Sequence, residues 1–240
     1  MTRIVAGSAG GRTIKVPAGG ARPTTERVRE AIFSLLEARM GGPGGWAGRA
    51  VLDLYAGSGA LALEALSRGA ASAVAVDSAP AAARAIKANA AALGLAARLT
   101  VRVARAEALV VDGAALAGRD GIGQVGGPPF DVAFLDPPYD APTSAPDAVL
   151  AALARPRLGS AGARAWLADA ALVVLERSAR TAAPTWPAGW DDIGVRKYGE
   201  TAVYLARAGG GPTRAEGGLG DGAGRRPDGG AAAGGRRGRG

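Results

Sequence analysis

The feature that most constrains the fold is an apolar run that ends in a glycine-rich turn and leads into a helical pattern. Residues 50–54 (Ala-Val-Leu-Asp-Leu) are almost wholly apolar and are followed by Gly57 and Gly59. A short run of this kind is typical of a strand buried in a parallel sheet. Residues 61–68 then show helical spacing and stop at a glycine, and residues 73–77 form a second apolar run. The order strand, helix, strand predicts an α/β fold.

The same alternation continues along the chain. The patterns predict a helix over residues 80–92 closed by Gly94, strands over 100–103, 132–135 and 171–176, a helix over about 146–154, and a terminal hairpin of residues 192–198 and 201–207 joined through Gly199-Glu200. Residues 112–129 are rich in glycine and proline and predict a loop. We therefore expect a doubly wound, Rossmann-like α/β sheet that ends in an antiparallel hairpin, with its ligand crevice at the carboxyl ends of the strands.

Composition divides the chain of 240 residues into three parts. Residues 1–40 carry seven cations against three acids and predict a basic extension with a helix. Residues 41–208 hold the α/β pattern. Residues 209–240 contain 14 glycines and one large apolar residue, Leu219, so this Gly/Arg-rich tail cannot bury enough surface to offset its ordering entropy. We expect the tail to be disordered.

Composition also excludes several kinds of chemistry. The chain has no cysteine and no histidine, which rules out disulfides, thiol nucleophiles, zinc sites built on Cys or His, and Ser-His-Asp arrangements. A net charge of +8 favours a polyanionic partner, but 26 of the 29 cations are arginine, a bias that coding composition alone also produces. No apolar run reaches the ~20 residues that span a bilayer, so we expect a cytoplasmic protein.

The turn after the first predicted strand has the features of a nucleotide-binding loop. Its glycines allow close approach of a ligand, and the following helix N-terminus favours negative charge. Asp77 closes the second predicted strand, where it can accept hydrogen bonds from ribose hydroxyls. The spacing Gly57-x-Gly59-x-x-Ala62 also fits the loose dinucleotide pattern, which leaves a nicotinamide cofactor open. The carboxylate of Asp53 suits the ammonium group of S-adenosylmethionine better than a pyrophosphate, and this favours a methyl donor.

The tetrapeptide Asp136-Pro137-Pro138-Tyr139 follows the predicted strand at 132–135. Two prolines fix the backbone, so the Pro137 carbonyl is held as an acceptor beside the Asp136 carboxylate. Tyr139 offers a flat face on which a base can stack. Two acceptors and a platform form a site for the exocyclic amine of an unpaired base. Acceptance of the amine's hydrogens would aim the nitrogen lone pair at the donor's methyl group and stabilise the positive charge that develops there. This chemistry needs no metal.

These motifs carry a resemblance to a known family. The combination of the Asp53–Gly59 loop with Asp136–Tyr139 is similar to class I S-adenosylmethionine-dependent amino-methyltransferases. The chain further resembles the bacterial guanine-N2 methyltransferases of small-subunit (16S) ribosomal RNA over about residues 1–207. The stretches that carry this are Arg3-Ile4 with Gly11-Arg12, Arg22-Pro-Thr-Thr-Glu-Arg-Val-Arg-Glu30, residues 52–68, Trp166-Leu-Ala-Asp169 and Gly199-Glu-Thr-Ala-Val-Tyr204.

The resemblance implies a function and a set of site residues. It implies methylation of one guanine's N2 amine in 16S-type rRNA, on a partly or fully assembled small subunit. Nothing in the sequence requires more than a monomer, and we expect one. The implied base site is Asp136, Pro137, Pro138 and Tyr139. The implied cofactor contacts are Asp53, Tyr55, Gly57, Ser58, Gly59, Asp77, Ser78, Ala106 and Glu107. The loop at 112–129 and the tail are departures from the family pattern.

Arginines near the N-terminus are the candidates for RNA contact. Arg22, Arg27 and Arg29 crowd the start of a predicted helix whose apolar residues would dock on the domain and leave the cations for phosphates. The alternative for this helix is a solvated face with Arg–Glu pairs, which the sequence favours less. Arg3 and Arg12 join the set of candidate RNA contacts. We expect Trp186 and Trp190 to pack under a loop, and we expect Glu64 and Glu176 to be structural.

Three alternative functions stay open on the sequence alone. An amino-methyltransferase for adenine N6 or cytosine N4 would use the same acceptors, because they recognise an amine and not a particular ring. A nicotinamide-dependent oxidoreductase is a rival of a different class. An RNA-binding module without catalysis is a third, which the intact Asp136 and Gly57–Gly59 disfavour.

Overall fold

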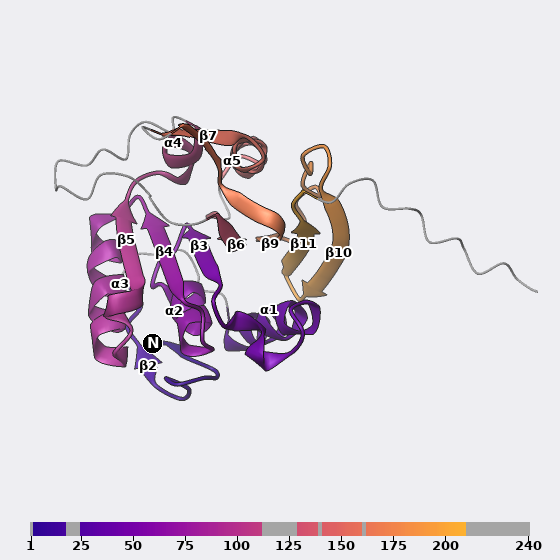
Figure 1. Cartoon of the computed structure of the whole chain (residues 1–240). Coiled ribbons are helices and arrows are strands. Elements are labelled where there is room, and N and C mark those ends of the chain that lie inside the picture. Colours follow the sequence, from indigo (N-terminus) through magenta and orange to yellow (C-terminus); the bar gives the residue numbers. More distant parts are fainter. Residues whose placement is uncertain (1, 18–24, 112–128, 139–140, 160–161, 210–240) are drawn as a thin grey trace, which may run out of the picture.

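A computed structural model describes residues 2–17, 25–111, 129–138, 141–159 and 162–209 of the chain (Figure 1). Several predictions lie outside these residues: the structure of nearly all of the 112–129 loop, that of the tail from residue 210 onward, and the positions of Arg22 and Tyr139. In the described part of the chain no helix is long and apolar enough to cross a membrane.

The described strands build a seven-stranded sheet at the centre of the molecule. Its order is β10 (Asp191–Tyr198), β11 (Thr201–Arg207), β9 (Leu167–Ser178), β6 (Phe130–Leu135), β3 (Ala50–Leu54), β4 (Ser72–Asp77) and β5 (Leu99–Val103). The five strands from β9 to β5 are parallel, while β11 pairs antiparallel with β9 and with β10. The order reverses at β3, which lies between β4 and β6. The predicted doubly wound α/β class with a terminal antiparallel hairpin is confirmed.

Helices cover both faces of this sheet. One face carries α1 (Glu26–Arg39), α2 (Ala60–Ser67) and α3 (Pro80–Leu93), and the other carries α4 (Ala106–Val111) and α5 (Ser144–Leu153). Successive residues of a strand point to opposite faces, so Val51 packs in the first core and Leu52 in the second. Both are fully buried. This two-sided burial is why β3 is a continuous apolar run and does not alternate with polar residues.

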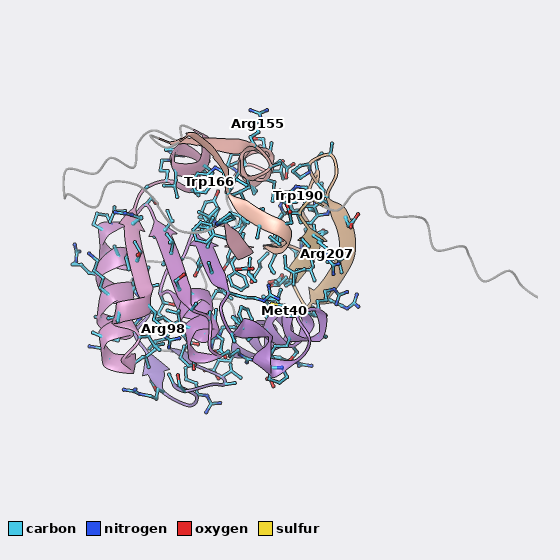
Figure 2. All side chains as sticks on the ribbon, in the orientation of Figure 1. Met40, Arg98, Arg155, Trp166, Trp190 and Arg207 are labelled. Carbon is cyan, nitrogen blue, oxygen red and sulfur yellow. The ribbon has the colours of Figure 1, made fainter. Side chains whose placement is uncertain are left out.

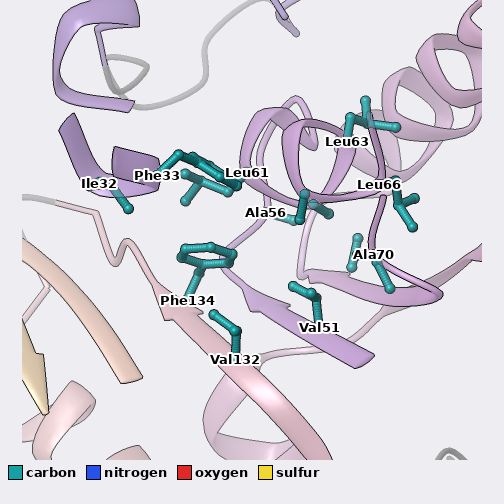
Figure 3. Packing of buried hydrophobic residues seen from close by; sticks show 14 of the residues in the cluster. Ile32, Phe33, Val51, Ala56, Leu61, Leu63, Leu66, Ala70, Val132 and Phe134 are labelled. Atoms are coloured by element: carbon teal, nitrogen blue, oxygen red, sulfur yellow. The ribbon is translucent and has the colours of Figure 1, made fainter. Parts of the chain in front are cut away.

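An aromatic contact joins α1 to the centre of the sheet. The rings of Phe33 in α1 and Phe134 in β6 face each other (Figure 3), with their centroids 5.7 Å apart. The ring of Phe33 also lies 5.1 Å from that of Trp46 between centroids. All three side chains are buried. The predicted docking of the apolar residues of the 26–39 helix on the domain is therefore present in the structure.

Some elements were not predicted. These are the short strands β1 (Thr2–Arg3), β2 (Thr13–Ile14), β7 (Pro156–Gly159) and β8 (Gly162–Ala165), the helix α4, and the 3-10 turns at Pro43–Trp46 and Ala96–Arg98. Strands of two to four residues are too short to show a period of two. The strand expected over 171–176 is also longer, since β9 has 12 residues. Its first part carries a register shift against β6 and a positive φ at Ala170, which interrupts the apolar pattern.

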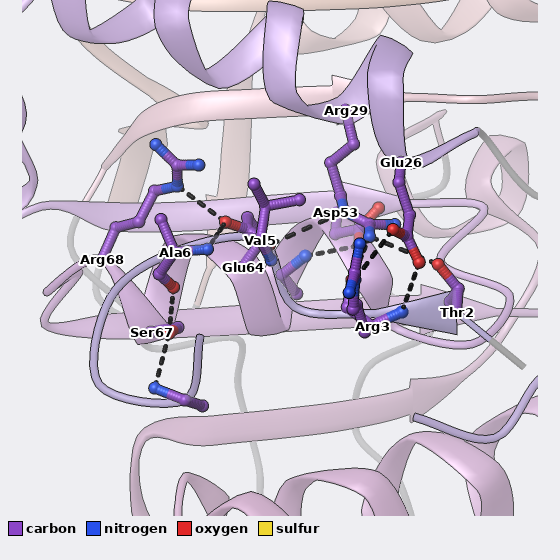
Figure 4. Close-up of polar contacts among 12 residues, drawn as sticks. Thr2, Arg3, Val5, Ala6, Glu26, Arg29, Asp53, Glu64, Ser67 and Arg68 are labelled. Atoms are coloured by element: carbon purple, nitrogen blue, oxygen red, sulfur yellow. Dashed lines mark hydrogen bonds and ion pairs between the residues drawn. The ribbon is translucent and has the colours of Figure 1, made fainter. Parts of the chain in front are cut away.

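The N-terminal hairpin is fixed to α2 by one buried carboxylate (Figure 4). Glu64 is fully buried and accepts hydrogen bonds from the backbone N–H groups of Val5 at 2.7 Å and Ala6 at 3.0 Å. It also pairs with Arg68 at 2.8 Å and with Arg29 at 3.6 Å. A carboxylate with four partners is not free for chemistry, so the expected structural role of Glu64 is confirmed.

This network overturns one prediction. Arg29 was expected to face RNA phosphates, but its side chain has no exposed surface. Its Nη2 donates to the Thr2 hydroxyl at 3.3 Å and to the Arg3 carbonyl, and its guanidinium faces Glu64. The prediction for Arg29 is wrong because a helical pattern of alternating cations and acids does not show which cation faces a buried acid on another helix.

Removal of the Glu64 carboxylate should be costly. Glu64→Leu would leave the buried Arg29 without its counter-charge and two backbone N–H groups without acceptors, so we expect a loss of about 3–5 kcal/mol in the free energy of unfolding. Arg29→Met should cost less, since Glu64 keeps Arg68 and both N–H donors. Urea denaturation of the two variants checks the order. If Glu64→Leu lowered the free energy of unfolding by less than Arg29→Met does, this account of the network would be contradicted.

Candidate functional site

The parallel strands bring the ends of β3, β4 and β6 to one edge of the sheet. Leu54, the last residue of β3, is in register with Val76 in β4 and Leu135 in β6. The residues that follow, from the 55–59 turn, Asp77 and Asp136, therefore begin at the same level. This is also the point where the strand order reverses, the usual place for a ligand in an open α/β sheet. The structure thus brings the two principal motifs of the sequence together.

The glycine turn is held in shape by its neighbours. Gly57 and Gly59 have positive φ values of 55° and 79°, which favour glycine. A Cβ at Gly59 would come within 3.1 Å of Ile86 in α3, whereas a Cβ at Gly57 would meet nothing within 4 Å. Gly59 is therefore needed for packing of the turn against α3. The space beside Gly57 leaves room for a ligand to approach the backbone.

Asp77 and Asn89 fix the two sides of this turn. The carboxylate of Asp77 accepts hydrogen bonds from the N–H groups of Gly57 and Ala79, both at 2.8 Å. Asn89 in α3 donates to the carbonyl of Ser58 at 3.0 Å and, at 2.9 Å, to the carbonyl of Lys15. Asp77, half-buried, thus orders the turn at the position where it was expected to meet a ribose. Ser78, beside it, is exposed.

Asp53 is the unusual group of the site. Its side chain is 1% exposed, one oxygen accepts from the Ala62 N–H at 3.0 Å, and the other oxygen has no partner. Burial raises the pKa of the Asp53 carboxyl from 3.8 to about 8; the Ala62 hydrogen bond lowers it, and the negative charges of Asp136 and Asp77 raise it further. A buried oxygen without a donor is an uncommon feature of a folded protein and marks a place where a ligand can supply one.

Tyr55 and Glu107 meet across the edge of the sheet. Tyr55 has a positive φ of 67°, which is strained for a bulky residue, and its hydroxyl donates to Glu107 at 2.9 Å. Burial, together with the Glu107 hydrogen bond and charge, raises the pKa of the Tyr55 hydroxyl. Glu107 lies in the first turn of α4, next to the buried Ala106. The contact brings the residues after β5 next to the glycine turn, as the predicted cofactor set requires.

The proline turn begins directly at the end of β6. Asp136 is half-buried, Pro137 is buried and Pro138 is exposed. The Pro138 carbonyl accepts from the Ala141 N–H at 2.9 Å, which closes the turn before α5. Asp136 acts electrostatically on Asp53, so the carboxyl groups of the two motifs lie near one another. The predicted aromatic platform, Tyr139, is outside the described residues.

Two ion pairs join α1 to α2. Arg29 pairs with Glu64 at 3.6 Å, and Glu37, eight residues later, pairs with Arg68 at 2.8 Å. The helix α1 begins at Glu26. The Thr25 hydroxyl caps this end by accepting from the Val28 N–H at 3.3 Å.

The other candidate RNA contacts differ in their availability. Arg27 is exposed in the first turn of α1 and makes no ion pair within the described residues. Arg3 is exposed but pairs with Glu26 at 3.0 Å. Arg12 is exposed and donates to the carbonyl of Ala92 near the end of α3. Arg22 lies outside the described residues. Arg27 is thus the candidate whose charge is least committed to the protein itself.

Comparison with known proteins shows to which family the chain belongs. Residues 2–207 match the family described as "Conserved hypothetical protein 95". The chain is 33% identical over 204 residues, 85% of its length, to "Ribosomal RNA small subunit methyltransferase D" of Escherichia coli K12, of which 88% is covered. The chain therefore belongs to the family described as "Conserved hypothetical protein 95". The predicted membership in a methyltransferase family is confirmed.

Two solved structures show the same fold. The structure of yhhF, a candidate methyltransferase from Escherichia coli, matches with a TM-score of 0.65 at 31% identity, covering 87% of this chain and 98% of that one. A hypothetical protein of Thermus thermophilus matches with a TM-score of 0.64 at 32% identity, covering 85% and 98%. The likeness extends over nearly the whole length of both relatives.

Arg177 is a residue of this edge that sequence reasoning missed. It lies near the end of β9, almost fully buried, and its guanidinium donates to the carbonyls of Ala182 at 3.1 Å and Thr143 at 3.3 Å and pairs with Asp147 in α5. It therefore ties the segment that follows the proline turn to the segment that follows β9. An arginine soon after the apolar run of residues 170–175 was the available signal, since a buried arginine needs buried partners.

The two tryptophans lie in the segment after β9. Trp186 and Trp190 have ring centroids 6.2 Å apart and pack, half-buried, against the core on the α5 face. Trp190 lies close to the hairpin of β10 and β11 (Figure 2). The expected packing of the two rings is confirmed, since both lie against the core. Glu176, beside Arg177, is buried in the sheet.

The buried Asp53 predicts how the stability of the ligand-free protein depends on pH. Between about pH 4 and pH 8 the folded state keeps a proton that the unfolded chain has released, so stability should fall as pH rises through this window and then level off. Asp53→Asn should flatten this decline. Thermal melts of the wild type, Asp53→Asn and the exposed control Asp169→Asn, each from pH 4.5 to 8.5, measure it. Parallel curves for the wild type and Asp53→Asn would contradict a raised pKa at this position.

Proposed function

We propose that this chain methylates the exocyclic N2 amine of a guanine in small-subunit ribosomal RNA, with S-adenosylmethionine as its cofactor. The observation that carries the proposal is the strand-end arrangement: the partly unpartnered carboxyl of Asp53 and the open side of Gly57 lie beside Asp136 and Pro137. The relative named as a small-subunit rRNA methyltransferase supports the choice of substrate. The monomeric state and the partly or fully assembled subunit as partner belong to the same proposal.

The residues present fit the cofactor. S-adenosylmethionine supplies, when bound, an electrophilic methyl group on a cationic sulfur. Asp53 would receive the ammonium of its amino-acid part, because one buried oxygen lacks a donor. Asp77 keeps free lone pairs for ribose hydroxyls beside the two N–H groups that it already accepts. Ser58, Gly59, Ser78, Ala106 and Glu107 complete the proposed contacts around the glycine turn.

The proline turn would orient the amine. The Asp136 carboxylate and the Pro137 carbonyl would each accept one amine hydrogen, which turns the nitrogen lone pair away from the ring and toward the methyl group. As positive charge develops on nitrogen, these two oxygens stabilise it where it forms. Pro137 and Pro138 restrict the backbone, so little reorganisation is needed at that moment. Tyr139 would stack on the base.

The identity of the modified nucleoside tests the substrate. Small subunits from a strain that lacks this protein, incubated with the pure protein and S-adenosylmethionine, should yield N2-methylguanosine on digestion and mass spectrometry. N6-methyladenosine or N4-methylcytidine would replace the guanine assignment with the adenine or cytosine one while leaving the methyltransferase chemistry intact. The absence of any methylated nucleoside would overturn the proposal.

Loss of one acceptor should abolish turnover. Asp136→Ala removes a group that acts on the developing charge, so we expect kcat to fall about 10²–10³-fold. The affinity for S-adenosylhomocysteine, measured by calorimetry, should change little because Asp136 is assigned to the base. Asp169→Ala, at an exposed carboxyl in β9, is the matched control. A kcat for Asp136→Ala within threefold of this control would contradict the role of Asp136 as an acceptor for the amine.

The exposed arginine of α1 should contribute to RNA affinity. Arg27→Ala should weaken binding to the RNA and reduce the slope of log affinity against log salt by about one, as expected for one lost phosphate contact. Arg39→Ala, exposed at the other end of the same helix, is the control. Equal slopes for the two variants would show that the start of α1 does not meet phosphate. Arg29 is left out because it is buried.

A further inference from the structure

Asp53 has little around it to balance a negative charge. The described charged groups that act on it are Asp77 at the end of β4 and Asp136 after β6, and both are negative. The third element against it, α2, contributes the Ala62 N–H at 3.0 Å. The second carboxyl oxygen is buried without a donor, and the side chain is 1% exposed. Bulk water therefore cannot screen an anion at this position.

Asp131, at the opposite end of the sheet, has the positively charged partner that Asp53 lacks among the described residues. Asp131, at the start of β6, pairs with the guanidinium of Arg49 at 3.2 Å and accepts from the Ala50 N–H at 2.8 Å. Asp131 is more exposed than Asp53 and still has a cation beside it. A buried carboxylate without a counter-charge costs several kcal/mol, and a protein lowers this cost by keeping the group neutral. A bound cation would supply the counter-charge that the described part of the protein does not itself place beside Asp53.

We propose that Asp53 exchanges a proton for a ligand cation: its carboxyl is protonated while the strand-end site is empty, and it releases that proton to the solvent when the ammonium group of S-adenosylmethionine binds beside it. The proposal rests on the assignment of Asp53 to the cofactor in the proposed function. In the exchange the carboxyl O–H bond breaks, its electron pair stays on oxygen and the proton passes to the buffer. The ammonium keeps all three of its hydrogens, so the site gains no net charge at the carboxyl–ammonium pair.

The exchange makes cofactor affinity depend on pH with a defined sign. A ligand that binds the ionised carboxyl must displace a proton below pH 8, so its affinity should rise by about tenfold per pH unit well below pH 8. The rise should stop near pH 8, where the carboxyl and the ligand ammonium both titrate. A ligand without an ammonium group should show no such rise. The device thus favours ligands that carry the amino-acid part of the cofactor over fragments that have only the nucleoside.

Proton counting by calorimetry tests the proposal directly. S-adenosylhomocysteine, which has the ammonium but no sulfonium, is titrated into the full-length protein at pH 6.5 in three buffers of different ionisation enthalpy. At this pH both the ligand ammonium and Asp53 are more than about 90% protonated, so the release measured comes from Asp53. We expect close to one proton released per ligand bound. Methylthioadenosine, which lacks the amino-acid part, should release about none.

Asp53→Asn is the matched variant, because an amide has nearly the same shape and cannot exchange the proton. It should bind S-adenosylhomocysteine more weakly than the wild type at pH 8 and release no proton at pH 6.5. Should this variant fail to fold, the wild-type affinities for the two ligands from pH 6 to 8 decide the matter, since only that for S-adenosylhomocysteine should rise.

Several results would overturn the proposal. They are no proton release with S-adenosylhomocysteine, equal release with methylthioadenosine, or full release in Asp53→Asn. If rRNA is methylated while no proton is released, the exchange is wrong and the proposed function stands. If S-adenosylhomocysteine does not bind at all, both fail.

Discussion

The structure depends on a parallel sheet that is buried on both faces. Because helices cover β3 and its neighbours on each side, a charged side chain within a central strand has no solvent to face. Charges are therefore placed at the strand ends. At the amino end of β6, Asp131 is paired with Arg49; at the carboxyl ends, Asp53 and Asp77 have backbone N–H groups as their partners in place of cations. The same constraint that stabilises the core thus concentrates carboxyl groups at one edge of the sheet.

The sequence predicted the central elements well because they are governed by local patterns. The residues of β3 were predicted with their correct limits, because a strand buried on both faces is a continuous apolar run. The helix α3 was predicted to within a residue, because the positive φ after its last turn favours a glycine, Gly94. The meeting of Gly57, Asp77 and Asp136 at one edge was also foreseeable. Parallel strands joined through helices must bring their carboxyl ends together.

What could not be predicted depends on contacts between distant segments. Arg27 and Arg29 are two residues apart on one helix and look alike in sequence, yet Arg27 is exposed and Arg29 is buried against Glu64, 35 positions further along the chain. Nothing local distinguishes them. Arg177 was missed for the same reason, because its partners Thr143, Asp147 and Ala182 belong to two other segments. The local sequence pattern predicts which face of a helix is buried, but the residue that a buried side chain pairs with is known only from the packed fold.

The acidic edge and the basic N-terminal part perform opposite electrostatic tasks within one site. In the proposed function a cationic cofactor would be attracted by Asp77 and Asp136, whereas a polyanionic RNA would be repelled by them. In the same proposal Arg27, exposed in the first turn of α1, would offset that repulsion. In the proposed exchange Asp53 adds no net charge to this edge in either state, because its carboxyl is protonated when the site is empty and is paired with the ligand ammonium when the site is occupied.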